Sequence, residues 1–348
     1  MFSGRSEIRV VDMYTLELGA KLGRTNEGKK CSAVVIMKQS KIMVYTMLFL
    51  LLLCIGLLLL WHLWPSSPRD GFSTDFSRIP STIWAYWDGD VPPLVQKCIE
   101  SWKKHNPTYE IIVLNKGSLS KYLPKVDFAK MKHVNDSVQR FSDFVRVHVL
   151  AEHGGMWIDA STICQAPLDW IQKIQQQDNV EFVGYFTYNM TLPKWRDASP
   201  ALENWAFACV PHSQFMQDWR DEMMKITTYD HIKEYSRHVV QNENIDPQRI
   251  PGAPDDIDYF AMHLAAQRVL QPNPNKYRLH LQCAEETALR YLCEPGSNDI
   301  VRTEETETRF AQRLIQREFP NEPLLKLPGF MRDRVEQWTD DYTFVLGP

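Results

Sequence analysis

The chain has 348 residues, of which 44% are hydrophobic, 11% aromatic and 24% charged. This composition is typical of a globular protein with a hydrophobic core, and it excludes a disordered or fibrous chain. The formal net charge of -4 and the pI near 6.2 give no overall basic excess. We therefore do not expect a nucleic acid partner.

Residues 42–64 form an apolar segment that is free of Asp, Glu, Lys and Arg. A helix of this length can cross a bilayer core of about 30 Å. Because many residues precede it and no small-residue cleavage site follows, a retained signal-anchor is favoured over a cleaved signal peptide. Eight lysines and arginines against four acids in residues 1–41 predict a cytosolic N-terminus. We expect a single-pass type II membrane protein, in the Golgi or endoplasmic reticulum with a lumenal main domain if the host is a eukaryote.

Residues 65–78 are rich in Pro, Ser and Gly, which predicts a short extended stem after the membrane helix. The remaining residues, 79–348, suit one α/β domain. Two N-x-S/T sequons, at Asn135 and Asn189, lie on the lumenal side and would make the protein a glycoprotein, although sequons also arise by chance. Five cysteines follow the membrane segment, and Cys283 and Cys293 are close enough in sequence to pair in a disulfide.

The domain opens with a β-rich stretch over 81–87, helical spacing over 92–105 and a second β-rich stretch over 109–114. Strand, helix, strand predicts a parallel pair with a crossover helix. Ser142 offers an N-cap for a helix that ends near His153, where Gly154 can adopt a left-handed C-cap conformation. Further elements are predicted as strands over 156–160, 181–188 and 205–210, helices over 213–225, 256–270 and 303–319, and an extended segment over 323–330.

The most informative motif runs from Asp143 through Arg146 to Asp159 and Ser161. Asp143 and Arg146 are three residues apart on the predicted helix and therefore share one face. Asp159 follows a predicted buried strand, and open α/β sheets bind ligands beyond the carboxyl ends of their strands. A carboxylate there can hold a cation or a sugar hydroxyl, and a guanidinium can bind diphosphate oxygens. A purely structural ion pair and a solvated strand-end acid explain the spacing equally well.

The segment Asp143-Phe-Val-Arg146 followed by Gly-Gly-Met-Trp-Ile-Asp159-Ala-Ser161 resembles the capsular polysaccharide synthesis family of glycosyltransferases. That family is related to the DxD sugar-binding family, which includes the Och1-like α-mannosyltransferases, and to the glucosylating clostridial toxins. The resemblance extends over about 79–330, through the opening strand that ends at Trp87, a later strand that carries Asn204, a helix start at Asp258 and Lys326 near the end.

The resemblance implies a GT-A-type, Rossmann-like domain that transfers a sugar, with retention, from a nucleotide-diphosphate donor to a glycan or lipid-linked acceptor. It implies that Trp87 stacks on the nucleotide base and that Asp143 and Arg146 bind the donor and belong, with Asp159, to the catalytic residues. Asn204 and Lys326 are further donor-binding candidates. A closed turn at Asn204 and a lone surface lysine at Lys326 are the structural alternatives.

The resemblance also implies a divalent cation, Mn²⁺ or Mg²⁺, with Asp159 in the first DxD position. Ser161 occupies the second position, and a hydroxyl is a weaker metal ligand than a carboxylate because it carries no charge. Asp258, or its neighbours Asp255 and Asp256, can supply the missing charge; a solvated acidic helix cap is the alternative interpretation of these three residues.

Two other classes of function remain open on the sequence alone. A catalytically inactive glycan-binding or scaffold protein could keep the same fold without using the three charged residues together. A glycoside hydrolase would need two carboxyl groups about 5–10 Å apart across a sugar bond, and the sequence does not reveal such a pair.

Overall fold

The computed structural model describes Leu50 and residues 75–347. The chain divides into two compact units, Met1–Ser73 and Thr74–Pro348, and the second contains the predicted α/β domain. The predicted membrane segment at 42–64 lies outside the described residues except for Leu50, as does most of the predicted stem. Within the described part of the chain, no helix is both long enough and apolar enough to span a membrane.

A mixed six-stranded sheet in the order β2-β1-β3-β6-β5-β7 forms the centre of the domain, and β4 and β8 form a separate antiparallel pair. Strand β1 is parallel to β2 and β3, β6 is antiparallel to both β3 and β5, and β7 is parallel to β5. The strand bounds are β1 Thr82–Tyr86, β2 Glu110–Leu114, β3 Gly155–Ile158, β4 Thr162–Cys164, β5 Phe182–Phe186, β6 Leu202–Cys209, β7 Leu279–Cys283 and β8 Leu324–Lys326.

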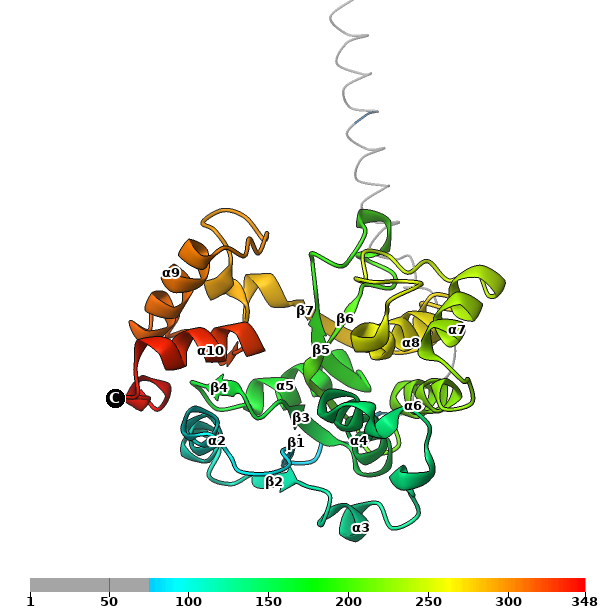
Figure 1. Cartoon of the computed structure of the whole chain (residues 1–348), viewed down its shortest axis with the longest axis horizontal. Helices are drawn as coiled ribbons and strands as arrows, with labels where there is room; N and C mark the ends of the chain where they lie inside the picture. Colours follow the sequence, from blue (N-terminus) through cyan, green and yellow to red (C-terminus); the bar gives the residue numbers. More distant parts are fainter. Residues whose placement is uncertain (1–49, 51–74, 348) are drawn as a thin grey trace, which may run out of the picture. The chain divides into compact units, whose positions relative to one another are not determined.

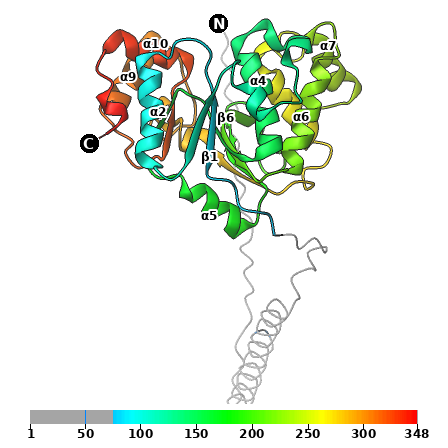
Figure 2. The same cartoon turned by 90° about the horizontal axis from the view of Figure 1, so that it is seen from below.

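Helices cover both faces of this sheet (Figure 1), with α2, α9 and α10 on one side and α4, α6 and α7 on the other (Figure 2). Their bounds are α2 Pro93–His105, α3 Leu119–Tyr122, α4 Val138–His153, α5 Asp169–Asp178, α6 Gln214–Ile226, α7 Ile232–Arg237, α8 Ala261–Leu270, α9 Glu304–Ile315 and α10 Gly329–Trp338. The three layers agree with the predicted α/β class.

Each face of the sheet has its own hydrophobic core, and the alternation of side chains along β1 shows how. Ile83 and Ala85 pack in the core that contains Trp102 of α2, whereas Trp84 and Tyr86 pack in the core that contains Phe144 of α4. Successive strand residues point to opposite faces, so β1 contributes to both cores. The central strands are consequently fixed on both sides.

The first predicted strand, helix and strand are confirmed as β1, α2 and β2. Thr82 to Tyr86 pair in parallel with Glu110 to Leu114. Trp84 is buried and donates its Nε1 hydrogen to the carbonyl of Gly154 at 3.0 Å. The opening strand therefore brings Trp87, the residue after its last paired position, to the carboxyl edge of the sheet.

The predicted start of the next helix at Ser142 is wrong. Helix α4 begins at Val138, because Ser137 caps it by accepting a hydrogen bond from the backbone N–H of Arg140 at 3.1 Å. The hydroxyl of Ser142 instead accepts a hydrogen bond from Arg146 Nη2 at 3.1 Å. Asp143 therefore lies in the second turn of the helix, away from its free N-terminal N–H groups.

Gly154 ends α4 with φ +64° and ψ -160°. The positive φ was expected, but this ψ is outside the left-handed helical region and in one that essentially only glycine occupies. A Cβ at this position would also lie 2.6 Å from the backbone nitrogen of Pro211. Both effects result from the tight reversal from α4 into β3.

We expect Gly154→Ala to lower the free energy of unfolding by about 1–3 kcal/mol, measured by thermal denaturation. Gly296→Ala is the matched control, since Gly296 has φ +77° but no atom within 4 Å of the position that a Cβ would take. Equal melting temperatures for the two variants would show that the contact with Pro211 adds no strain.

Two predictions near the C-terminus and among the cysteines need correction. The segment predicted as extended over 323–330 contains the short strand β8, but α10 already begins at Gly329. Cys283 and Cys293 are both buried and free, so the expected disulfide does not form. The Cys283 thiol lies near Oε2 of Glu285 (3.6 Å), and the Cys293 thiol lies near backbone carbonyls instead.

Both sequon asparagines use their side-chain amides inside the fold. Asn135 Nδ2 donates to the carbonyl of Phe128 at 3.2 Å, and Asn189 Nδ2 donates to Glu285 Oε1 at 3.0 Å and to the carbonyl of Asn298 at 2.9 Å. A glycan on Asn189 would replace a hydrogen atom of this amide and disrupt contacts of the folded loop. Glycosylation at either asparagine stays a prediction.

Candidate active site

A cavity of about 640 Å³ opens beyond the carboxyl ends of β1 and β3. Strand β1 lies between β2 and β3 in the sheet, so the chain order reverses at this point. Ligands of open α/β sheets bind in the crevice at such a switch point, and the volume is within the range of small-molecule sites. Seven of the residues selected from the sequence line it: Trp87, Asp143, Arg146, Asp159, Ser161, Asn204 and Lys326.

Arg146 is the structural centre of the site. Its guanidinium is buried and lies 3.2 Å from Asp143 Oδ1 and 3.4 Å from Asp159 Oδ1. It also donates to the carbonyl of Asn204 and to both oxygens of Ser142, and it lies over the ring of Trp157. The pairing of Asp143 with Arg146 on one helix face is confirmed. Because these protein groups use its donors, Arg146 positions the two carboxylates in this structure.

Asp159 follows β3 directly and has partners on both carboxylate oxygens. Oδ1 accepts a hydrogen bond from Trp157 Nε1 at 3.0 Å, and Oδ2 pairs with Lys326 Nζ at 2.7 Å. Burial alone would raise the pKa of Asp159, but the cations Lys326 and Arg146 outweigh it and hold this pKa below its usual value. Asp159 is therefore ionised at neutral pH.

Asp143 has a different electrostatic environment. Burial raises its pKa to about 6 even though Arg146 opposes the shift, and the neighbouring charge of Asp159 raises it further. Asn204 Nδ2 donates to Asp143 Oδ1 at 3.2 Å. Asn204, which is predicted to bind the sugar donor, thus contacts Asp143 directly. Its backbone carbonyl also accepts a hydrogen bond from Arg146. Asn204 does not simply close a turn, because it lies within β6.

Lys326 reaches the site because β8 pairs with β4, with Lys326 opposite Thr162. Its ammonium lies 2.7 Å from Asp159 Oδ2 and 3.2 Å from Ser161 Oγ, and its side chain is only 11% exposed. The alternative of a lone surface lysine is therefore wrong. Ser161 in turn donates its hydroxyl hydrogen to the carbonyl of Leu327 at 3.0 Å.

The candidate metal ligands are not brought together. Asp258 does not line the cavity; its carboxylate is 69% exposed and lies 4.0 Å from Arg140 Nη2. Its neighbour Asp255 pairs with Arg237 at 2.7 Å. Between residues 75 and 347 there is no group of three or more His, Cys, Asp or Glu side chains that could hold a metal ion. The ammonium of Lys326 lies against both Asp159 and Ser161, so this pair does not present a vacant donor set for a divalent cation.

Several cavity residues were not selected from the sequence. Glu203 precedes Asn204 on β6, and its pKa is raised to about 8 by burial and by the charge of Glu285. Arg332 extends from α10, Tyr259 forms an exposed aromatic rim, and His263 is buried with its pKa lowered to about 3 by desolvation. Glu203 had a visible signal, since it directly precedes Asn204 in the sequence.

The sequence profile described as "Capsular polysaccharide synthesis protein" matches residues 72–237. This part of the chain is therefore similar to that family. The matched part contains the segment from Asp143 to Asp159 together with Trp87 and Asn204, so the resemblance is confirmed where its most specific residues lie. Lys326, Arg332 and the whole of α10 lie beyond the matched residues.

Solved structures of glycosyltransferases are similar to the chain at low identity. The PaToxG glycosyltransferase is 15% identical over 78% of this chain and 88% of its own, with a TM-score of 0.35. The UDP-bound glycosyltransferase domain of the YGT toxin is 10% identical over 77% and 95%, with a TM-score of 0.36. The galactosyltransferase LgtC, in complex with donor and acceptor sugar analogues, is 12% identical over 76% and 95%, with a TM-score of 0.38. These values describe a distant likeness, from which nothing about this chain's activity follows. No curated protein sequence matches the chain.

Proposed function

We propose that this protein is a glycosyltransferase with a GT-A-type domain, which transfers a sugar from a nucleotide-diphosphate donor to a hydroxyl of a glycan or lipid-linked acceptor. The observation that carries the proposal is the cavity at the switch point of the sheet. It combines an aromatic ring at Trp87, fixed carboxylates at Asp143 and Asp159, and a cation at Lys326. The match to the capsular polysaccharide synthesis family supports it.

These groups meet the separate needs of a nucleotide-sugar. The indole of Trp87 offers a face for stacking on the base, and its orientation is fixed because Nε1 donates to the carbonyl of Asp90 at 3.0 Å. Asp143, Asp159 and Asn204 offer oxygen acceptors for ribose or sugar hydroxyls. Lys326 supplies positive charge for the diphosphate, on which negative charge develops as the glycosidic bond breaks.

In the proposed reaction the bond between the anomeric carbon and the diphosphate oxygen breaks, and its electron pair leaves with the diphosphate. The acceptor oxygen forms the new bond to the anomeric carbon, and its proton passes to the departing phosphate. Asp143 and Asp159 are both held in ion pairs, which favours substitution on the same face over a covalent intermediate on either carboxylate. A glycosyl adduct on Asp143 or Asp159, trapped and detected by mass spectrometry, would contradict this route.

The test is release of the nucleoside diphosphate when the full-length protein is incubated with a panel of nucleotide-sugars. We expect release with at least one donor and a loss of about 100-fold or more in Asp159→Asn, because a preorganised charge in the site is removed. Asp246→Asn is the matched control: Asp246 also pairs with a lysine, Lys194, and accepts from a tryptophan, Trp195, outside the cavity. Absence of release from every donor would favour an inactive glycan-binding protein.

For the N-terminal segment we propose the type II arrangement, with residues 42–64 in the membrane and the transferase domain on the lumenal side. The apolar run and the basic residues that precede it support this proposal. Protection of the domain from protease in sealed microsomes, and its loss on addition of detergent, is the expected result. Cleavage of the domain in intact microsomes would contradict it.

A further inference from the structure

A divalent cation in this cavity would need oxygen ligands that no other cation occupies, and Asp159 and Ser161 are the pair that the family resemblance implies for it. A cation already contacts each oxygen of Asp159, since Arg146 lies 3.4 Å from Oδ1 and Lys326 lies 2.7 Å from Oδ2, and the hydroxyl of Ser161 donates to Leu327 and accepts from Lys326. The ammonium that contacts both residues carries the positive charge that a cation would otherwise bring.

Lys326 is held in this position by its backbone as well as by its side chain. Its N–H donates to the carbonyl of Ala288 at 3.2 Å, and its carbonyl accepts from the hydroxyl of Tyr291 at 2.6 Å. Strand β8 fixes it opposite Thr162. An ammonium held in this way is preorganised, so it costs little reorganisation when an anion binds.

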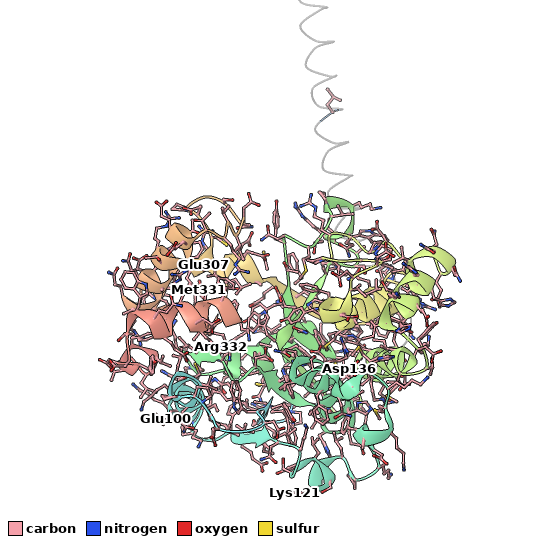
Figure 3. All side chains as sticks on the ribbon, in the orientation of Figure 1. Glu100, Lys121, Asp136, Glu307, Met331 and Arg332 are labelled. Carbon is pink, nitrogen blue, oxygen red and sulfur yellow. The ribbon has the colours of Figure 1, made fainter. Side chains whose placement is uncertain are left out.

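Arg332 adds a second cation to this side of the cavity. Among residues 75–347 no ion pair involves Arg332, and its Nε is buried without a hydrogen-bond partner. The guanidinium lies 5.9 Å from the centre of the Trp87 ring. Figure 3 labels Arg332 on α10, the helix that starts at the cavity.

The same guanidinium lies over the first turn of α10. A Cβ built on Gly329 would be 3.6 Å from Arg332 Nη2, and Pro328, Gly329 and Arg332 all line the cavity. The first N–H groups of a helix have no carbonyl partner within the helix, and they favour anions. Lys326, Arg332 and the start of α10 therefore bring three anion-binding features to one wall.

The charges of the cavity have a simple balance at neutral pH. Asp143 and Asp159 offset Arg146 and Lys326, with which they pair, and Glu203 carries little negative charge because burial raises its pKa to about 8. Asp88 also lines the cavity and pairs with Lys116 at 3.5 Å, so Arg332 is the cavity cation without an ion-pair partner among residues 75–347. The diphosphate of a nucleotide-sugar carries two negative charges; Arg332 offsets one of them, and the N-terminus of α10 adds a partial positive charge.

We infer that Lys326, Arg332 and the N-terminus of α10 bind the diphosphate of the donor in place of a divalent cation, so that donor binding is independent of metal. The inference rests on the proposed function, since it assigns a subsite to the donor of that reaction. It departs from the metal site that the family resemblance implies for Asp159 and Ser161.

The experiment measures, by calorimetry on the full-length protein, the affinity for UDP, GDP and CDP and for the corresponding nucleosides, each with EDTA or with Mn²⁺. We expect at least one nucleoside diphosphate to bind with an affinity that differs by less than about threefold between EDTA and Mn²⁺. We expect Lys326→Met and Arg332→Met each to weaken that affinity by about tenfold or more, while nucleoside affinity stays unchanged. Lys326→Arg is expected to retain most of the affinity.

Lys97→Met is the matched control, because Lys97 also pairs with an acid at 2.7 Å but lies on α2, where Figure 3 labels its partner Glu100. Loss of diphosphate binding in EDTA with recovery in Mn²⁺ would overturn the inference and leave the proposed function intact. No binding of any nucleoside diphosphate under either condition would overturn both. The comparison of EDTA with Mn²⁺ uses the unmodified protein, so it is decisive even if a variant does not fold.

Discussion

Arg146→Met is expected to lower the free energy of unfolding by about 3–5 kcal/mol, since breaking a buried ion pair leaves its partners uncompensated. Asp143 and Asp159 both lie within 3.4 Å of the guanidinium, and Asn204 and Ser142 would also lose its hydrogen bonds. For a domain of this size the melting temperature should fall by roughly 10 °C. Thermal denaturation at neutral pH measures it.

The same change should reduce nucleoside diphosphate release by about 100-fold or more, because the carboxylates lose the group that positions them. Arg146→Lys should give an intermediate loss, since an ammonium cannot contact Asp143, Asp159 and the carbonyl of Asn204 with the geometry of a guanidinium. Arg220→Met is the control: Arg220 pairs with the exposed Asp221, and a surface pair contributes at most about 1 kcal/mol. Equal melting temperatures for the Arg146 and Arg220 variants would contradict the central role of Arg146.

Glu203→Gln is expected to change how stability depends on pH. The pKa of Glu203 is raised from 4.5 to about 8, first by burial and then by the charge of Glu285. Between these two values the folded protein keeps a proton that the unfolded chain has released. Folding therefore takes up a proton. The contribution of Glu203 to the free energy of unfolding falls as the pH rises from 4.5 to about 8, by at most about 1.4 kcal/mol per pH unit.

Glutamine has the shape of the protonated acid and does not titrate, so the variant should lack this contribution. We expect Glu203→Gln to melt at nearly the temperature of the unmodified protein near pH 5 and several degrees above it near pH 8.5. Glu322→Gln is a comparison outside the cavity, where the pKa is also raised by burial but by less. If the difference in melting temperature between Glu203→Gln and the unmodified protein does not grow as the pH rises, the raised pKa of Glu203 is contradicted.

The sequence predicts the central part of the site because its geometry is local. Asp143 and Arg146 are three residues apart, so they share one face of the helix regardless of where the helix begins. Asp159 directly follows a strand, so it lies at the carboxyl edge of the sheet regardless of the position of that strand in the sheet. The contact of Arg146 with Asp159 needs only α4 and β3 to be consecutive elements. The start of α4 cannot be read from the sequence, because Ser137 and Ser142 offer equivalent capping side chains.

The wall formed by α10 could not be predicted in the same way. Lys326 lies 167 residues from Asp159 in the chain, and it reaches that acid through the pairing of two three-residue strands, β4 and β8, for which the sequence has no register signal. The segment 323–330 is predicted as extended, whereas Met331 and Val335, four residues apart and buried, belong to helix α10, which begins at Gly329. Contacts of this range depend on the packing of the whole domain.

The most direct test of the donor site is hydrogen exchange of the full-length protein with and without a saturating nucleotide-sugar identified from the panel. We expect slower exchange on binding in α4, in the residues that follow β3, and in residues 326–332 at the start of α10, because these segments line the cavity. A separate cavity lies between α6 and α8 and contains Asp218 and Lys276. Slower exchange only at that cavity, or at none of these segments, would contradict the assignment of the donor to the switch point of the sheet.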